Sequence, residues 1–149
     1  MGCPNLGELG EHITAQWLQG QGYEILASRW RCRWGELDLI AYQSYSQQPL
    51  SSPLLFVEVK TRQSSNWDAD GLLAISPQKQ KKLYRTAEIF LSRHPHLASV
   101  GCRFDLALVK ARSSCGNRKN PLNAKVELNN PVYCQGYELT LTSYLEAIF

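Results

Sequence analysis

Residues 54–60 read Leu54-Leu55-Phe56-Val57-Glu58-Val59-Lys60, an apolar segment that carries one acid and one base near its end. Its β-branched and aromatic residues are typical of a strand in the core of a sheet. Because side chains alternate along a strand, Glu58 and Lys60 share one face while Val59 points the other way. The segment therefore predicts a core strand that carries charged side chains at two positions.

A second apolar segment interrupted by an acid lies upstream. Gly35 is followed by Glu36-Leu37-Asp38-Leu39-Ile40-Ala41, and this pattern predicts another strand. If the two strands are neighbours in the sheet, Asp38 converges with Glu58 and Lys60. The sequence thus predicts two acids and a lysine at one place on an otherwise apolar sheet.

The remaining segments predict two long helices and further strands. Apolar spacing of three and four predicts a helix from Leu6 to about Gln19, and Ser76-Pro77 predicts the start of a helix that runs to about Arg93. Strands are expected at 23–28, 102–109 and 137–141, a short strand or irregular edge at 125–128, a short closing helix at 143–149, and loops at 42–53, 63–71 and 113–131. This order predicts an α/β fold, a mixed β-sheet flanked by helices, in one domain over residues 1–149.

Composition narrows the class of protein. The chain has 149 residues, of which 44% are hydrophobic and 19% charged, as in globular domains. No apolar run approaches the roughly 20 residues of a membrane span, so no membrane partner is expected. The five cysteines form no CxxC pair, which argues against a zinc site or a disulfide framework and favours a cytoplasmic location. A net charge of +3 is compatible with nucleic-acid binding without establishing it.

Ionised groups on apolar strands are costly unless they are paired or bound to metal. One interpretation is structural, a salt bridge between Glu58 or Asp38 and Lys60 or Arg62. A single lysine cannot neutralise two acids, however, so a divalent cation is an economical partner. Carboxylate oxygens favour Mg²⁺ or Mn²⁺ over zinc.

Several motifs together resemble the UPF0102 (YraN-like) family, which is related to archaeal Holliday-junction resolvases and to the PD-(D/E)xK nuclease superfamily. The short E-x-K pattern is weak alone, but the ordered set is specific and covers nearly the whole chain. The motifs that carry the resemblance are Gly7–Glu11, Gly35–Ile40, Phe56–Arg62, Ser76–Gln80, Cys102–Asp105 and Ala147–Phe149.

The resemblance implies a restriction-endonuclease-like fold and a metal-dependent phosphodiesterase centre. By position, Asp38 and Glu58 would hold Mg²⁺ or Mn²⁺, helped by the backbone carbonyl of Val59. Glu11 would complete the ligand shell directly or through water. Lys60 would orient the attacking water or stabilise charge on the phosphate. The implied catalytic residues are thus Asp38, Glu58, Lys60 and Glu11.

Basic residues flank this centre and are candidates for nucleic-acid binding. Lys79 and Lys82 lie on the second helix, Arg62 follows the acidic strand, and Arg33 precedes Asp38. They are expected to contact phosphates, which positions a duplex without reading its sequence. The alternative is a solvated charged face, or, for Arg62, a pair with a strand carboxylate.

Two further groups of residues have competing interpretations. Trp30, Trp34 and Trp67 could stack on bases, although tryptophans that pack back onto the core are commoner. Arg103 and Asp105 share one strand face and are expected to form a structural pair.

The leading hypothesis is a Mg²⁺- or Mn²⁺-dependent endonuclease that acts on DNA, with branched or damaged DNA as candidate substrates. The partner is expected to be DNA rather than RNA, and a homodimer would suit two symmetric cuts. One alternative is a non-catalytic nucleic-acid-binding domain that keeps the nuclease fold. Another is a structural domain whose acids and lysine are only ion pairs. No G-x-G-x-x-G or Walker loop follows a predicted strand, which disfavours a nucleotide-cofactor enzyme.

Overall fold

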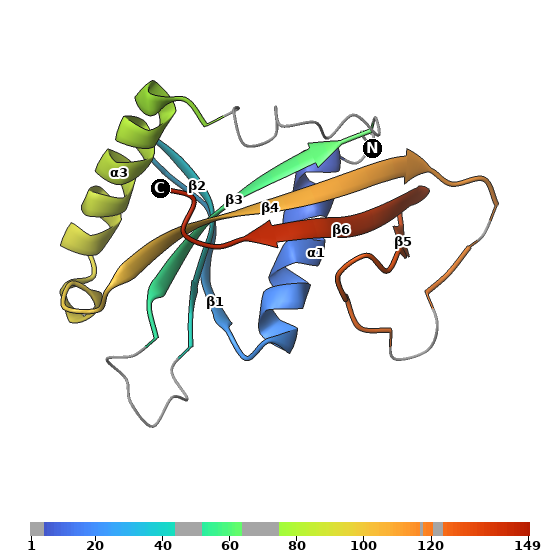
Figure 1. Cartoon of the computed structure of the whole chain (residues 1–149), viewed down its shortest axis with the longest axis horizontal. Helices are drawn as coiled ribbons and strands as arrows, with labels where there is room; N and C mark the ends of the chain where they lie inside the picture. Colours follow the sequence, from blue (N-terminus) through green and yellow to red (C-terminus); the bar gives the residue numbers. More distant parts are fainter. Residues whose placement is uncertain (1–4, 44–51, 64–74, 117, 121–123) are drawn as a thin grey trace.

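The structure is a computed structural model, and it describes residues 5–43, 52–63, 75–116, 118–120 and 124–149. Those residues form two α-helices and six strands (Figure 1). In chain order the elements are α1 (Leu6–Gly20), β1 (Glu24–Cys32), β2 (Gly35–Tyr42), β3 (Leu54–Arg62), α3 (Pro77–Ser92), the 3₁₀ turn η1 (Pro95–Leu97), β4 (Cys102–Ser113), β5 (Val132–Cys134) and β6 (Tyr137–Leu145).

The six strands form one mixed sheet in the order β1-β2-β3-β4-β6-β5. β3 and β4 are parallel, and the other neighbouring pairs are antiparallel. Parallel neighbours need a long crossover connection, and α3 lies in that connection. The predicted α/β fold with a mixed sheet is confirmed, and it is consistent with a restriction-endonuclease-like fold.

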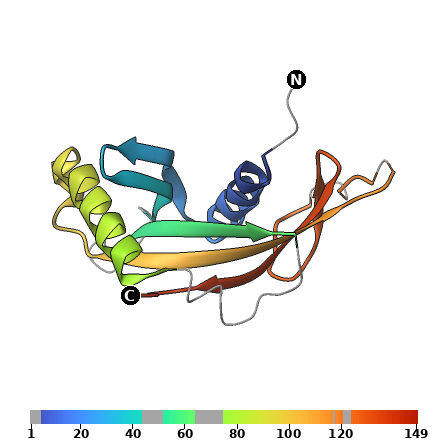
Figure 2. The ribbon, with the colours of Figure 1, turned by 90° about the horizontal axis from the view of Figure 1, so that it is seen from above.

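Each helix covers one face of the sheet. Leu9, Ile13 and Leu18 of α1 pack on the face that includes Leu55 and Val57. The apolar side of α3 packs on the opposite face, against residues such as Phe56 and Phe104 of β3 and β4. Because alternate residues of β3 serve the two cores, this strand is apolar on both faces until Glu58. The β1–β2 hairpin lies between α1 and α3 (Figure 2).

Both helices begin with a side-chain cap, as the sequence pattern predicts for α3. Asn5 Oδ1 accepts a hydrogen bond from the N–H of Gly7 at 2.8 Å. Ser76 Oγ accepts from the N–H of Lys79 at 3.1 Å, and Pro77 occupies the first turn. The cap fixes the residue at which α3 starts, and it therefore fixes the position of Lys79 in the first turn.

α1 approaches β3 unusually closely at Gly10. A Cβ atom on Gly10 would overlap the side-chain oxygen of Thr61. That Thr61 hydroxyl is buried and is the only such buried side-chain atom without a hydrogen-bond partner among the described residues. The glycine is therefore needed for the close packing of α1 on β3.

Several predicted boundaries were wrong. Residues 143–149 form no helix, because Ser143, Tyr144 and Leu145 continue β6 and pair with β4. Of the two alternatives for residues 125–128, the strand is absent and the backbone there is irregular. Strand β5 was not predicted, and it pairs with β6. β1 runs to Cys32, and β4 to Ser113, because their ends pair with β2 and β6 respectively.

In the described part of the chain, neither helix has the length and apolar character that crossing a bilayer requires.

Candidate functional site

The predicted acids meet where β2 and β3 separate. The ladder between these strands pairs Ala41 with Leu55, Ile40 with Phe56 and Leu39 with Val57, and then stops. The next rung would pair Asp38 with Glu58. β2 stays paired with β1 down to Gly35, and β3 stays paired with β4 up to Arg62, so the two strands diverge while each remains in the sheet.

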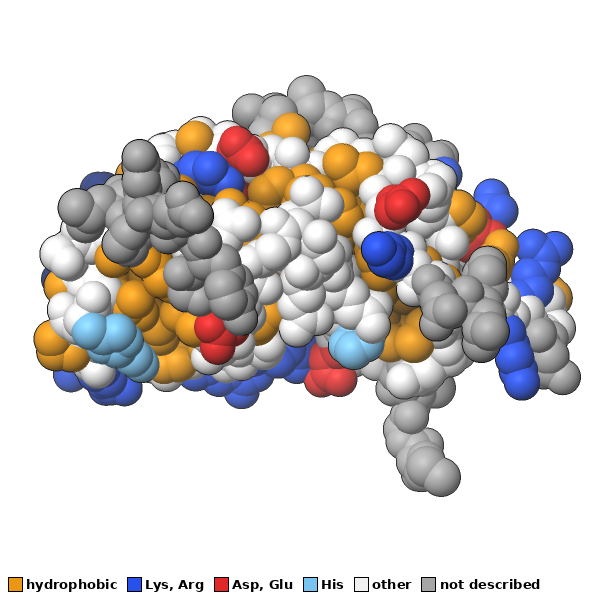
Figure 3. Space-filling model, turned by 90° about the horizontal axis from the view of Figure 1, so that it is seen from below, with side chains coloured by type: hydrophobic (Ala, Val, Ile, Leu, Met, Phe, Trp, Pro, Cys, Tyr) orange, Lys and Arg blue, Asp and Glu red, His pale blue; other side chains and the backbone are white. Residues whose placement is uncertain are grey.

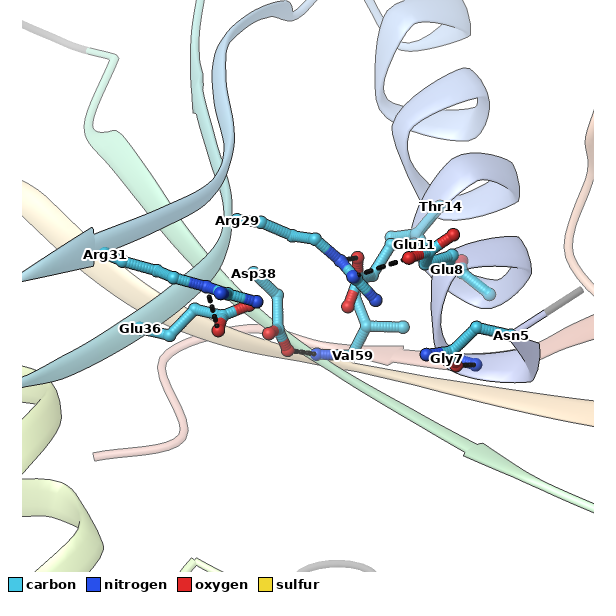
Figure 4. Close-up of polar contacts among 11 residues, drawn as sticks. Asn5, Gly7, Glu8, Glu11, Thr14, Arg29, Arg31, Glu36, Asp38 and Val59 are labelled. Carbon is cyan, nitrogen blue, oxygen red and sulfur yellow. Dashed lines mark hydrogen bonds and ion pairs between the residues drawn. The ribbon is translucent and has the colours of Figure 1, made fainter. Parts of the chain in front are cut away.

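Asp38 replaces the missing backbone ladder with its side chain. Its Oδ2 accepts a hydrogen bond from the N–H of Val59 at 2.8 Å (Figure 4). In a strand, the N–H and the carbonyl of one residue face the same neighbour. The carbonyl of Val59 therefore faces the same gap as the Asp38 carboxylate.

Burial and the negative charge of Glu58 raise the pKa of Asp38 to about 7, although the Val59 N–H acts in the opposite direction. A buried carboxyl behaves this way when too little positive charge is near it. Among the described residues, no lysine, arginine or histidine lies within ion-pair distance of Asp38. The site therefore holds one acid whose charge is incompletely compensated.

Glu58 is buried and is held by two lysines. Its Oε1 lies 2.6 Å from Nζ of Lys79 and 3.2 Å from Nζ of Lys60. Lys60 comes from the same face of β3, as predicted. Lys79 comes from the first turn of α3, so the sequence could not place it beside Glu58. We call the group of Asp38, Glu58, Lys60 and Lys79 the fork site.

The two lysines differ in how firmly they hold a proton. Burial, together with the contact to Lys79, lowers the pKa of Lys60 despite the neighbouring Glu58. Burial is the largest single effect on Lys79 and acts to lower its pKa, but the hydrogen bonds with Glu58 and Lys60 and the charges of Glu58 and Asp38 together outweigh it, so the pKa is raised. Lys79 is thus the fixed cation of the pair, and Lys60 is the one that loses its proton more readily.

Glu11 lies near the fork site but is engaged by an arginine. Nε of Arg29 lies 2.7 Å from Oε2 of Glu11, and the same guanidinium reaches Glu8 at 2.7 Å. Figure 4 shows Arg29 extending from β1 to these glutamates of α1. The charge of Glu11 nevertheless contributes to the raised pKa of Asp38. Arg29 was missed as a site residue, and its backbone adopts a positive φ of 51°.

The donor set of the fork site fits a magnesium-like ion in part. In the described part of the chain, no three His, Cys, Asp or Glu side chains cluster as a metal group would. Mg²⁺ keeps several waters, however, and is commonly held by one or two carboxylates. Two adjacent carboxylates, one with uncompensated charge, and the Val59 carbonyl meet that need. The fit rests on hard oxygen donors and on the charge deficit at Asp38.

The other predicted contact residues lie outside the fork site. Arg62 is exposed and donates a hydrogen bond to the carbonyl of Thr61 at 3.2 Å. Arg33 is exposed, with its guanidinium carbon 4.9 Å from the centre of the Trp34 ring. Lys82 is exposed on α3. These positions are accessible to a charged ligand and do not form part of the acidic centre.

The positive charge is unevenly spread over the surface. On the face in Figure 3, the Lys and Arg side chains lie mostly toward the rims, and its middle is largely uncharged. Although the net charge of the chain is +3, its basic side chains are not evenly distributed over that face.

The predicted tryptophans separate into two kinds. Trp30 packs edge-on against Phe90 at 5.4 Å between ring centres, which is a core role. Trp34 is 38% exposed at the β1–β2 turn. Trp67 lies outside the described residues.

Comparison with known proteins gives one family. The family model described as "Uncharacterised protein family UPF0102" matches residues 10–109, which include the whole fork site. A UPF0102 protein of Acaryochloris marina is 44% identical over 153 residues, covering 97% of this chain and 89% of its own. One from Synechocystis is 39% identical over 151 residues, covering 97% of both chains. One from Synechococcus is 54% identical over 108 residues, covering 72% of this chain and 77% of its own.

Proposed function

This chain belongs to the UPF0102 family, and from its fork site we propose that it is a metal-dependent nuclease that hydrolyses DNA phosphodiester bonds. The observation that carries the proposal is the juxtaposition of Asp38 and Glu58, on diverging strands, with two lysines beside them. Acids and cations gathered in one partly buried place suit a reaction in which negative charge builds up on phosphate.

Asp38, Glu58 and the Val59 carbonyl would hold Mg²⁺ or Mn²⁺, with water and phosphate oxygens filling the remaining positions. When bound, such an ion lowers the pKa of water and clamps a phosphate for in-line displacement. Glu11 would join this set through water, because its carboxylate is held by Arg29.

The lysines supply positive charge beside the reacting phosphate. Lys60 Nζ donates hydrogen bonds to a non-bridging phosphate oxygen or to the attacking water, where its lowered pKa also allows proton exchange. Lys79 keeps Glu58 in place through the 2.6 Å contact. Asp38 is anchored by the Val59 backbone, so its position depends on the strand and not on a mobile rotamer.

Labelled duplex, single-stranded and four-way-junction DNA, incubated with the protein and Mg²⁺ or Mn²⁺, test the proposal. Asp38→Asn and Glu58→Gln should each lower cleavage by about 10² or more, since each removes charge from the metal centre. Glu88→Gln makes the same change at an exposed position of α3 and should cleave like the wild type. Cleavage that survives both site variants would indicate a contaminating nuclease and overturn the assignment.

A second candidate is a DNA-binding domain that does not cut. It is favoured by the pairing of Glu58 with two lysines, which neutralises that acid without metal. This candidate predicts salt-sensitive DNA binding with no product under any metal. In that case Asp38→Asn would leave DNA affinity unchanged or improve it, because a negative charge near the phosphates is removed.

A further inference from the structure

A basic hollow with an aromatic wall lies beside α3. It has a volume of about 420 Å³ and is lined by Trp34, Lys81, Lys82 and Arg85. We call it the Trp34 hollow. Its volume falls within the roughly 300–1,000 Å³ of small-ligand sites. Among the described residues, the lining offers three cations, no carboxylate and one large exposed ring, so it suits an anion that also has a flat apolar part.

The fold holds the two walls of the hollow together. Trp34 lies in the β1–β2 turn, next to Gly35. A Cβ on Gly35 would come within 3.0 Å of Thr86 Oγ1, so the turn rests directly on α3. Lys82 and Arg85 are three residues apart on that helix and therefore lie on one side of it. The hollow is thus a formed feature of the hairpin–helix contact.

The Trp34 ring already attracts planar cations. The guanidinium carbons of Arg85 and Arg33 lie 4.1 Å and 4.9 Å from its centre. A nucleobase that stacks on an aromatic ring gains more than an exposed cation–π contact does. A base can therefore replace one guanidinium on the ring, and the displaced arginine is then free to contact the flanking phosphate.

We propose that the Trp34 hollow is a seat for one unpaired nucleotide, with the base on Trp34 and its phosphates on Lys82 and Arg85. A paired base presents neither face to a side chain, so the site selects DNA with a single-stranded segment. The inference rests on the proposed function for its ligand, nucleic acid, and does not depend on hydrolysis.

The hollow also lies close to the fork site. Lys82 stands one helical turn beyond Lys79, the lysine that holds Glu58. On the other wall, Trp34 precedes Asp38 by four residues, about 13 Å along a strand. A strand seated on Trp34 can therefore continue toward the two carboxylates within a few nucleotides. The proposed binding site therefore selects DNA in which an unpaired nucleotide lies next to the segment held at Asp38 and Glu58.

Fluorescence anisotropy in EDTA tests the inference with the full chain, a labelled 15-residue oligo-dT and a duplex of the same length, at fixed ionic strength. Trp34→Leu should weaken oligo-dT binding about tenfold and duplex binding less than about twofold. Trp34→Phe, which keeps a ring, should recover most of the loss.

Arginine variants provide the matched control. Arg85→Ala removes a cation of α3 that lies over Trp34, and Arg93→Ala removes the cation of the residue that caps the end of α3 and lies over Trp30. Only Arg85→Ala should reduce the preference for oligo-dT over duplex. Equal effects of the two variants would show a general charge effect and overturn the proposal.

The outcomes separate this inference from the nuclease proposal. Binding of oligo-dT that depends on Trp34, without cleavage in Mg²⁺ or Mn²⁺, would support the seat and overturn the nuclease. Cleavage with single-strand preference unchanged in Trp34→Leu would support the nuclease and overturn the seat. Equal losses of oligo-dT and duplex binding in Trp34→Leu, or no binding of oligo-dT by the wild type, would also overturn it.

Discussion

The carboxylate of Asp38 takes the place of a backbone rung by accepting the N–H of Val59 at 2.8 Å. The β2–β3 ladder ends one position before this side chain, and Asp38 is hydrogen-bonded to the strand that carries Glu58. The acid therefore lies at the point where the two strands separate. Because the Asp38 carboxyl is part of the folded structure, its pKa can be measured through the pH dependence of the free energy of unfolding.

Asp38→Asn should stabilise the metal-free protein at pH 8. The pKa of Asp38 is about 7 in the folded state, above its ordinary value of 3.8, so the folded protein binds this proton more tightly. Stability therefore falls as pH rises from about 4 to about 7. The amide cannot ionise and still accepts from Val59, so we expect a gain of about 1–3 kcal/mol at pH 8 that vanishes near pH 4. Urea unfolding in EDTA at several pH values measures it.

The matched control is Glu88→Gln, at an exposed position on α3. Its stability should follow that of the wild type within about 0.5 kcal/mol at each pH. Parallel curves for Asp38→Asn and the wild type between pH 4 and 8 would contradict the raised pKa.

Millimolar Mg²⁺ or Mn²⁺ should raise the melting temperature of the wild type. A ligand at about 100 times its Kd adds about 2.7 kcal/mol, which corresponds to several degrees for a chain of this size. The shift should be larger at pH 8 than at pH 6, because the ion competes with the proton on Asp38. Asp38→Asn should lose the shift and Glu88→Gln should keep it. A shift of equal size in all three proteins would locate the ion elsewhere.

Lys79→Met should destabilise the metal-free protein by about 1–2 kcal/mol, because among the described residues the buried Glu58 then keeps Lys60 alone as an ion-pair partner. Lys82→Met, one turn further along α3 at an exposed position, should change stability by less than about 0.5 kcal/mol. Thermal unfolding of the two variants at one pH gives the comparison. Equal effects would mean that the Lys79–Glu58 contact contributes nothing beyond surface charge.

Asp105 should be a stability residue and not a site residue. It is fully buried and accepts hydrogen bonds from Arg103, from the Tyr144 hydroxyl at 2.7 Å and from the N–H of Ala147 at 3.0 Å. Asp105→Ala should cost about 3–5 kcal/mol, and Tyr144→Phe about 1–2 kcal/mol. Urea unfolding measures both. DNA affinity and any cleavage by folded Tyr144→Phe should equal those of the wild type, and a specific loss there would assign the network to function.

Local pattern was enough to predict the elements that carry the site. The apolar run before Glu58 and the alternation around Asp38 gave β3 and β2, and Ser76-Pro77 gave the start of α3. The expected pair of Arg103 and Asp105 is also present, with Nε to Oδ1 at 2.8 Å. These features depend on residues that are near each other in sequence or share one strand face.

What sequence reasoning missed depends on distant partners. The sequence around Ser143–Leu145 predicts a helix, but in the structure this segment pairs with β4 as part of β6. Lys79 reaches Glu58 across 21 residues, and Arg29 reaches Glu11 across 18. Neither contact could be predicted from the neighbouring sequence. A long basic side chain can reach any of several acids, and the sequence does not indicate which of them the fold brings next to it. The catalytic roles of the fork-site residues remain predictions.

The close approach at Gly10 has a consequence for the neighbouring position. Glu11 follows directly, so the depth at which α1 sits on β3 also sets how far that carboxylate stands from the acids of the sheet. Any larger residue before it would push the helix outward and carry Glu11 away with it. The spacing of acids on two different elements is therefore governed by a residue that has no ionisable group at all.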